Sequence, residues 1–359
     1  MDRRSLMKHA GIAGVLGAGI APAVHAQAAI RWRLASSFPK PLDTIYGGAE
    51  VFAKKVSDMT AGKFQISVHA GGELMPPFGV VDGVQQGSVE MCHTVPYYYF
   101  GKNEAFAIGA AIPFGMNSRQ MSAWMYEGNG RKLMNEFYAK YNMVSFPGGN
   151  TGTQMGGWFR KEIKTVADLK GLKFRIGGFA GRVVERLGVV PQNLPGGEIY
   201  QALEKGTLDA AEWVGPYDDQ KLGFNKVAPF YYYPGWWEGG PEVDFFVNDK
   251  ALAALPAEYR AIIEAAASHA HIDLQAKYDA RNPTALKQLV GAKTRILPFP
   301  KPVLDASFKA SMELYAELSE KNPDWKKIYT DYRAFQKDQI LWFRFAESRF
   351  DTYMQSVTL

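Results

Sequence analysis

Two stretches of sequence decide the fold: Leu172-Lys173-Phe174-Arg175-Ile176 and, further along the chain, Leu208-Asp209-Ala210-Ala211-Glu212-Trp213. Each is a short run of mainly apolar residues, as expected of a largely buried strand. Helical patterns lie between them at residues 181–187 and 199–205, and Gly206 ends the second. Strands that alternate with helices predict an α/β fold built on a parallel sheet.

The same rhythm extends outward in both directions. Towards the amino terminus we expect a strand with Ile30, Trp32 and Leu34, and then a helix, a strand at 64–68, a helix at 78–86 and a strand at 89–93. On the other side we expect strands at 143–146, 154–159 and 243–247 and a helix from 257 to about 278. The sequence therefore predicts two lobes, one formed by residues 29–146 plus 244–325 and the other by residues 147–243.

The carboxyl-terminal segment has an unusual composition. From Asp324 onward it contains no Gly and no Pro, and apolar and aromatic residues recur at helical spacing. We expect a long helix over 326–359, and a helix of about 30 residues spans about 45 Å. Its aromatic stripe requires a covering surface, which either the same chain or a second copy would provide.

Residues 1–26 have the pattern of an export signal. Arg3-Arg4 begins a twin-arginine pattern, an uncharged stretch rich in Gly and Ala follows, and small residues surround a cleavage position after Ala26 or Ala28. We expect the protein to be exported to the periplasm, by the twin-arginine route. Removal of 1–26 takes away three basic residues and one acidic residue, which changes the net charge from +5 to +3.

Composition and motifs exclude several classes of protein. The balanced charge and the lack of a basic cluster argue against nucleic-acid binding. Cys92 is the only cysteine, so neither an internal disulfide nor a thiolate metal site can form. No phosphate loop follows a strand and no nucleophile elbow occurs, so we expect no catalytic residues and no enzyme activity.

Polar residues instead stand where the predicted strands end. Arg175 lies at such an end, where α/β sheets bind ligands, and a guanidinium can hold a carboxylate by two parallel hydrogen bonds. Glu212-Trp213 ends another strand, and Glu238 follows a pair of tryptophans. If both acids reach one pocket, a hard cation would relieve their repulsion, with Gln154 as a further oxygen ligand. A surface location of Arg175 and of both acids stays an open alternative.

Longer runs around these residues resemble a known family. The runs Leu169 to Arg175, Leu187-Gly188-Val189-Val190-Pro191 and Glu198 to Glu212 are similar to those of the solute receptors of tripartite ATP-independent periplasmic (TRAP) transporters. Gly72-Glu73-Leu74 and Val84 to Met91 fit the same family. The similarity extends from about residue 30 to about residue 355 and preserves the spacing between the arginine and the Gly-x-x-Asp run.

The resemblance implies a two-lobe periplasmic solute-binding fold, a type II-like clamshell with a ligand cleft between the lobes. It implies that Arg175 holds the carboxylate of a small organic acid, and the nearest branch binds 2-oxo monocarboxylates or lactate. In that branch a Gln, a Glu-Trp pair and a later Glu gather Na⁺ or Ca²⁺ shared with the ligand. The matching residues are Gln154, Glu212 with the Trp213 carbonyl, and Glu238.

The resemblance further implies that the tyrosine run contacts the ligand, and strand alternation would group Tyr97 with Tyr99 and leave Tyr98 on the other side. It implies TRAP membrane subunits as partners and a homodimer formed through the long carboxyl-terminal helix. Three alternatives stay open: a TRAP receptor for a dicarboxylate or sugar acid without metal, a receptor of an ATP-driven importer or sensor kinase, and an exported enzyme.

Overall fold

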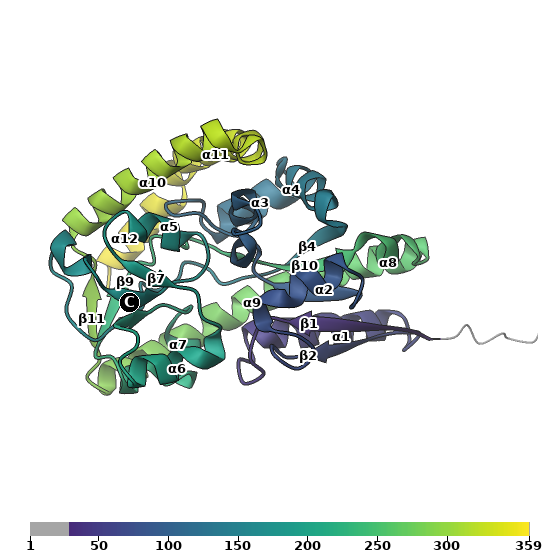
Figure 1. The fold of residues 1–359 in the computed structure, drawn as a ribbon, viewed down its shortest axis with the longest axis horizontal. Coiled ribbons are helices and arrows are strands. Elements are labelled where there is room, and N and C mark those ends of the chain that lie inside the picture. The colour runs from purple at the N-terminus through teal and green to yellow at the C-terminus, as the bar shows by residue number, and fades with distance from the viewer. Residues whose placement is uncertain (1–28, 359) are drawn as a thin grey trace, which may run out of the picture.

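The computed structural model describes residues 29–358, which form two β-sheets with helices around them (Figure 1). The predicted signal segment 1–26 lies outside the described residues. The first sheet has the strand order β2-β1-β3-β10-β4. Its strands are β1 (Ile30–Ser36), β2 (Phe64–His69), β3 (Met91–Thr94), β4 (Met143–Asn150) and β10 (Glu242–Asn248).

The first sheet is mixed, and the predicted parallel arrangement is confirmed only for β1, β2 and β3. β1 is parallel to β2 and β3, but β10 is antiparallel to β3 and β4. The chain leaves this sheet at the carboxyl end of β4 and returns beside it at the start of β10, where Glu242 pairs with Asn150. A chain that leaves and returns at the same edge must run in opposite directions in the two strands. This pairing also extends β4 to Asn150, beyond the strand predicted at 143–146.

The second sheet has the order β11-β9-β5-β8-β6-β7 and is also mixed. Its strands are β5 (Trp158–Phe159), β6 (Lys173–Arg175), β7 (Val190–Gln192), β8 (Ala210–Ala211), β9 (Phe230–Tyr233) and β11 (Arg295–Pro298). β6 is parallel to β7 and β8, whereas β5 is antiparallel to β8 and β9. β11 lies within the range 244–325 predicted for the first lobe, yet it pairs with β9 of the second sheet.

Short helices surround the sheets and confirm the helices predicted at 78–86, 181–187 and 199–205. The α-helices up to β10 and just after it are α1 (Ile45–Met59), α2 (Val80–Gln85), α3 (Ser118–Tyr126), α4 (Gly130–Tyr138), α5 (Ala180–Glu185), α6 (Gly196–Glu204), α7 (Pro216–Lys221) and α8 (Asp249–Ala253). The 3₁₀ helices are η1 (Pro77–Gly79), η2 (Pro96–Tyr99), η3 (Glu104–Gly109), η4 (Ala139–Tyr141), η5 (Val166–Leu169) and η6 (Phe224–Lys226).

One long helix, α9 (Ala257–Gly291), connects the two lobes. It packs on α1 and β4 of the first sheet and continues to α7 beside the second (Figure 1). We expected it to end near Tyr278, but it continues through Pro283. Packing of its last turns outweighs the proline, because Ala285 and Leu289 are buried and the Asn282 side chain accepts a hydrogen bond from Tyr217 N at 3.0 Å.

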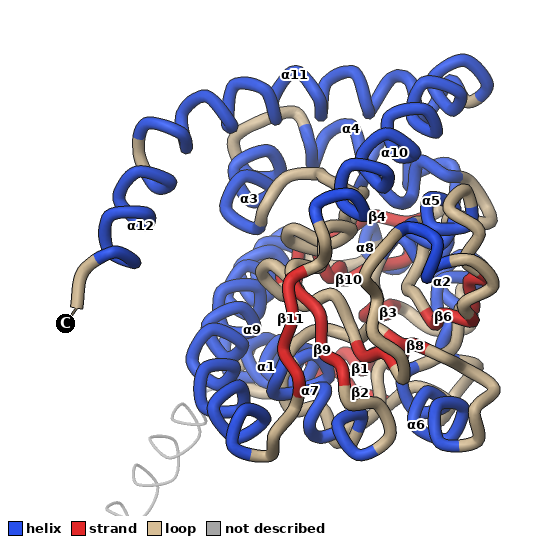
Figure 2. Tube along the Cα trace, turned by 90° about the vertical axis from the view of Figure 1, so that its left-hand side faces the viewer, coloured by secondary structure: helices blue, strands red, loops and turns tan. Residues whose placement is uncertain are grey.

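The carboxyl-terminal part consists of α10 (Lys301–Lys321), α11 (Pro323–Phe345) and α12 (Glu347–Ser356). The predicted long helix is confirmed as far as Phe345 and then changes direction at Ala346, after which α12 extends away from the sheets (Figure 2). Arg119 of α3 lies at this bend, over the Phe343 ring and paired with Glu347. Within residues 29–358, none of the helices has the combined length and apolarity that crossing a membrane requires.

Candidate ligand and cation site

The site is built on two neighbouring parallel strands of the second sheet. Arg175 is the last residue of β6 and pairs in register with Ala211 of β8, so Glu212 follows at the same edge. Both side chains are only 1% exposed, and Arg175 Nη1 lies 2.5 Å from Glu212 Oε1. The prediction that these residues stand at strand ends is confirmed, whereas the alternative of a surface arginine is wrong.

The protein itself occupies most of the Arg175 guanidinium. Its Nε donates to Leu194 O at 3.0 Å, and its Nη1 donates to both Glu212 O at 2.8 Å and Glu212 Oε1. The guanidinium carbon lies 5.1 Å from the centre of the Trp213 ring, within cation–π range. Nη2 has no hydrogen-bond partner among the described residues. Nη2 is therefore the nitrogen available to an anion. The two parallel hydrogen bonds to a carboxylate expected from the sequence would require Nη1 to break its hydrogen bonds to Glu212.

Glycines bring the backbone close to Glu212. Gly157 has a φ of +83°, and a Cβ there would lie 2.7 Å from Ala211 O and 2.9 Å from Glu212 Cα. Gly177 N donates to Glu212 Oε1 at 2.5 Å. A side chain at residue 157 would displace the end of β8, so glycine at this position keeps the carboxylate in place.

Glu238 and Gln154 approach the site on the segments next to the lobe crossings. Gln154 N donates to Glu238 O at 3.1 Å, and Gly235 N donates to Gln154 O at 2.8 Å. The Gln154 side chain donates from Nε2 to Thr151 Oγ1 at 3.1 Å. Glu238 is 1% exposed and Gln154 is 4% exposed. The backbones of these two buried residues are therefore in contact, and their joint role at a cation site stays a prediction.

Four buried side-chain oxygens have no hydrogen-bond partner in the part of the chain that the structure describes. They are Gln154 Oε1, Glu212 Oε2, Glu238 Oε1 and Glu238 Oε2, and we call them the open oxygens. Buried polar atoms are nearly always paired, so four of them on three neighbouring residues indicate a site for a bound group.

The charges at the site do not balance within the protein. Burial, together with the charge of Glu212, raises the pKa of Glu238 well above its ordinary value of 4.5. Burial also raises the pKa of Glu212, against the opposing charge of Arg175. Burial disfavours the Arg175 cation, but the charge of Glu212 and the smaller effects of Tyr98, Tyr97 and Glu238 together outweigh burial and raise the pKa of Arg175. One guanidinium thus faces two carboxylates, and ionising both leaves an excess negative charge.

The open oxygens fit a hard cation. Carboxylate and amide oxygens are the ligands that Ca²⁺ takes, and Na⁺ accepts the same kind of oxygen set. Across residues 29–358, no group of three or more His, Cys, Asp or Glu side chains could hold a metal ion. A site with two acids, one amide and room for ligand oxygens suits Na⁺ or Ca²⁺ better than a transition metal.

Residues of both lobes line a small cavity of about 10 Å³ beside Arg175. A volume of about 10–15 Å³ holds about one water molecule, so the lining side chains nearly fill this space. The lining residues are Ile45, Val95, Tyr97, Tyr98, Thr151, Gln154, Arg175, Trp213, Val214 and Pro241. Ile45, Val95, Thr151, Val214 and Pro241 were not predicted. Val95 lies two residues before the tyrosine run and could have been found from it, but nothing in the sequence connects Ile45 with the cavity.

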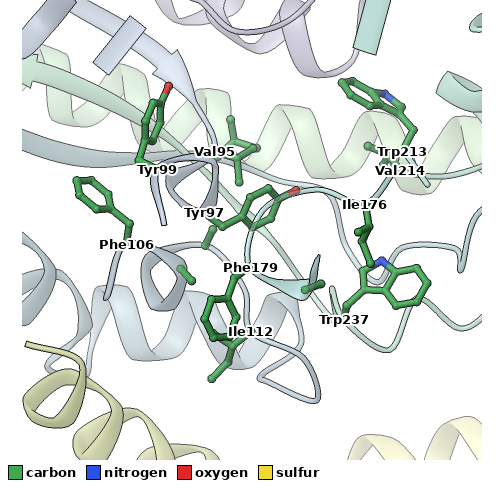
Figure 3. Close-up of a cluster of buried hydrophobic side chains, with 14 of the residues drawn as sticks. Val95, Tyr97, Tyr99, Phe106, Ile112, Ile176, Phe179, Trp213, Val214 and Trp237 are labelled. Atoms are coloured by element: carbon green, nitrogen blue, oxygen red, sulfur yellow. The ribbon is translucent and has the colours of Figure 1, made fainter. Parts of the chain in front are cut away.

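The tyrosines do not follow strand alternation, because they belong to the 3₁₀ helix η2. Tyr97 and Tyr98 line the cavity, whereas the Tyr99 hydroxyl lies 3.0 Å from Thr94 Oγ1 within the first lobe. Figure 3 shows the Tyr97 hydroxyl directed towards Trp213, Val214 and Ile176 and the Tyr99 hydroxyl directed elsewhere. The expected grouping of Tyr97 with Tyr99 is therefore wrong. Burial raises the pKa of Tyr98 to about 12.

Comparison with known proteins identifies the family. The family model DctP, bacterial extracellular solute-binding protein, family 7, matches residues 35–322. The monocarboxylate 2-oxoacid-binding periplasmic protein of Nostoc sp. PCC 7120 is 48% identical over 91% of this chain and 90% of its own length.

Solved structures also match over nearly the whole chain. A TRAP transporter solute-binding protein of Bordetella bronchiseptica RB50 is 52% identical with a TM-score of 0.91, over 92% of this chain and 98% of that one. It is a mixed-occupancy dimer with copurified calcium and picolinate in one site and an apo second site. A TRAP periplasmic solute-binding protein of Pseudoalteromonas atlantica T6c, with bound sodium and pyruvate, is 41% identical with a TM-score of 0.87, over 92% of this chain and 100% of that one.

These matches confirm the family resemblance predicted from the Arg175 and Glu212 runs. The chain belongs to the DctP family of bacterial extracellular solute-binding proteins, the solute receptors of TRAP transporters, and it is a transport protein and not an enzyme.

Proposed function

We propose that this chain is the periplasmic receptor of a TRAP transporter for a small 2-oxo or 2-hydroxy monocarboxylate, such as pyruvate or lactate, which it binds together with Na⁺ or Ca²⁺. The observation that carries the proposal is a group of buried polar atoms without partners among the described residues. Arg175 Nη2 and Gln154 Oε1 belong to residues that line one cavity, and the other open oxygens belong to Glu212, which pairs with Arg175, and to Glu238, whose backbone contacts Gln154. The 2-oxoacid name of the Nostoc relative and the sodium and pyruvate in the Pseudoalteromonas structure support the same ligand class.

Each lining group has a role in this proposal. Arg175 Nη2 donates to the ligand carboxylate, and the Trp213 ring stacked on the guanidinium forms a wall of the cavity. Burial keeps the Tyr97 and Tyr98 phenols protonated at neutral pH, so each can donate to a ligand oxygen. Tyr99 supports η2 through Thr94 rather than through ligand contact.

The open oxygens and the Trp213 carbonyl would hold the cation. Gln154, Glu212 and Glu238 supply the side-chain oxygens, and the carboxylate and 2-oxo or 2-hydroxyl oxygens of the ligand complete the set. A bound Na⁺ or Ca²⁺ would neutralise the excess negative charge of the two glutamates. A dicarboxylate bound without metal would leave both acids uncompensated, so the charge balance favours a monocarboxylate.

Ligand binding would favour the closed arrangement of the lobes, because residues of both lobes line the cavity. A ligand shifts the open–closed equilibrium only by its different affinity for the two states. We propose that residues 29–146 plus 244–325 and residues 147–243 move relative to each other about the crossings near 147 and 243, except that β11 moves with the second sheet. The closed receptor would then deliver its ligand to the TRAP membrane subunits.

The same proposal includes a homodimer formed through the carboxyl-terminal helices. Leu341 and Trp342 of α11 and Phe350 and Tyr353 of α12 are more than half exposed, and Phe345 is 73% exposed. Single chains seldom expose so contiguous an apolar surface without a partner. The Bordetella relative, which this chain matches over 92% of its length, is a dimer. Export through the twin-arginine signal at 1–26 completes the proposal.

A calorimetric ligand panel tests the assignment. Purified protein is dialysed against chelator and then titrated with pyruvate, 2-oxobutyrate, lactate, succinate and a sugar acid, each with Na⁺, with Ca²⁺ and with choline as the only added cation. We expect the monocarboxylates with an adjacent oxygen to bind and succinate to bind at least about 100-fold more weakly. Tight binding of succinate, or of no acid in the panel, would overturn the proposal.

A further inference from the structure

Two consecutive buried aspartates at the start of α7 face different lobes. Asp219 points into the second lobe, where its carboxylate accepts hydrogen bonds from Trp158 Nε1 at 2.9 Å and from Tyr231 Oη at 2.7 Å. It also accepts from the backbone N–H groups of Val214 and Gly215, both at 3.1 Å. Because Val214 lines the ligand cavity, Asp219 fixes one wall of the cavity to α7.

Asp218 points towards the first lobe. Its Oδ1 accepts from the Thr44 hydroxyl at 2.5 Å, and its Oδ2 accepts from the Tyr278 hydroxyl of α9 at 2.7 Å. Asp218 and Thr44 are both fully buried. Thr44 immediately precedes Ile45, which begins α1 and lines the cavity from the first lobe. The contact therefore joins two segments that each carry a residue of the cavity wall.

Asp43, the neighbour of Thr44, makes a second contact with α7. It pairs with Lys221 of α7 and, at 2.6 Å, with Arg281 of α9, and Tyr217 Oη donates to it at 3.2 Å. Partial burial opposes ionisation, but the hydrogen bonds from Lys221 and Arg281 lower the pKa of Asp43 to about 2. At neutral pH Asp43 is thus an anion held between two cations, one from each of two helices.

We infer that Asp43, Thr44 and Asp218 form a latch between the lobes that sets how long the closed, ligand-bound receptor persists before it releases its ligand. The inference rests on the proposed function only in requiring that the lobes close on a ligand. None of the three residues lines the cavity, so their contribution is separate from ligand recognition. If residues 41–44 move away from α7, the Thr44–Asp218 hydrogen bond and the Asp43–Lys221 ion pair both break.

The geometry couples the latch to occupancy of the cavity. Ile45 and Val214 line the cavity from opposite lobes. Ile45 directly follows Thr44, and Val214 donates its backbone N–H to Asp219, the neighbour of Asp218. A ligand that brings these two residues together also brings Thr44 to Asp218. Contacts that form only on closure slow dissociation more than they change association.

Release kinetics test the latch. Thr44→Val removes the hydroxyl and keeps the shape of the side chain. Asp43→Asn removes the charge, and the fold tolerates this change because the Asp43 side chain is 49% exposed. Asp58→Asn is the matched control, because it breaks the Lys54–Asp58 pair within α1, which does not join the lobes. Dissociation of pyruvate is followed by tryptophan fluorescence in stopped flow, in the presence of the supporting cation.

We expect both latch variants to release pyruvate about 10-fold faster, with association unchanged within about 2-fold, and Asp58→Asn to release it at the wild-type rate. The melting temperature of the ligand-free protein should not change. Added choline chloride should accelerate release from the wild type and have little effect on Asp43→Asn, since it screens the exposed ion pairs.

Wild-type release rates in both latch variants would overturn the latch while leaving the proposed function intact. A loss of ligand-free stability that matches the loss of affinity would also overturn it, because the contacts would then be purely structural. Failure of the wild type to bind any monocarboxylate would overturn the proposed function first, and the latch with it.

Discussion

Replacing Arg175 by Met separates the two tasks of this side chain, which are to balance a buried charge and to bind the ligand. Met fills most of the same volume but supplies no charge and no donors. The change removes the Nη1 contacts to Glu212 Oε1 and Glu212 O and the Nε contact to Leu194 O. The Glu212 carboxylate keeps only its hydrogen bond from Gly177 N.

The expected loss of stability follows from these contacts. Breaking a buried ion pair by removing one partner costs about 3–5 kcal/mol, because it leaves an uncompensated charge. A backbone acceptor left unpaired at Leu194 O adds about 1 kcal/mol. We therefore expect Arg175→Met to lower the free energy of unfolding by about 4–6 kcal/mol. Adding Glu212→Gln removes the stranded charge and should recover about 2–3 kcal/mol of that loss.

The assay is urea unfolding of four ligand-free proteins, the wild type, both single variants and the double variant, followed by circular dichroism. Calorimetry with pyruvate and cation runs in parallel. We expect a coupling energy of about 2–4 kcal/mol between the two positions, with no pyruvate binding in either variant that lacks Arg175. A coupling energy near zero would refute the buried-pair reasoning, and wild-type affinity in Arg175→Met would refute the ligand role.

Three further predictions concern the cation site and the carboxyl-terminal helices. Glu238→Gln removes one of two buried like charges, so the ligand-free protein should melt at the same temperature or higher. The cation-dependent affinity for pyruvate should fall by at least about 100-fold. A lower melting temperature with unchanged pyruvate affinity would contradict the site. An acid whose pKa is raised in the folded state holds its proton more tightly when the protein is folded. The stability of the ligand-free protein should therefore fall as pH rises from 4.5 through the pKa of Glu238. Cation binding to Glu238 should release a proton. Calorimetry in buffers of different ionisation enthalpy at about pH 5.5 and about pH 8 should detect that proton, and its persistence in Glu238→Gln would exclude this residue as its source. Phe345→Glu combined with Phe350→Glu should yield a monomer by light scattering with pyruvate affinity unchanged within about 2-fold, and a persistent dimer would place the interface elsewhere.

Local sequence signals located the core of the site. Arg175 and Glu212 could be placed together because parallel neighbouring strands end at one edge, and that rule needs only the strand pattern. Glu238 and Gln154 were first considered as oxygen ligands of a hard cation, and the family resemblance then assigned both to a cation site; their backbones are in contact. What these residues share is a position next to a strand end or a lobe crossing.

The missed features depend on contacts between distant parts of the chain. The Thr44–Asp218 contact joins residues 174 positions apart, and neither residue stands out in its own segment. The direction of β10 is set by where the chain re-enters the first sheet, which strand patterns do not encode. The tyrosine run was misjudged because Pro96 begins a 3₁₀ turn in what resembled the end of a strand.

The central claim is that acid and cation bind as one unit on Arg175 and the open oxygens, and reciprocal calorimetry tests it most directly. Pyruvate is titrated into cation-free protein and into protein with Na⁺ or Ca²⁺, and the cation is titrated with and without pyruvate. The account predicts that each raises the affinity of the other by the same factor, as linkage requires. Equal pyruvate affinity in chelated, sodium-free buffer and in buffer with either cation would contradict it.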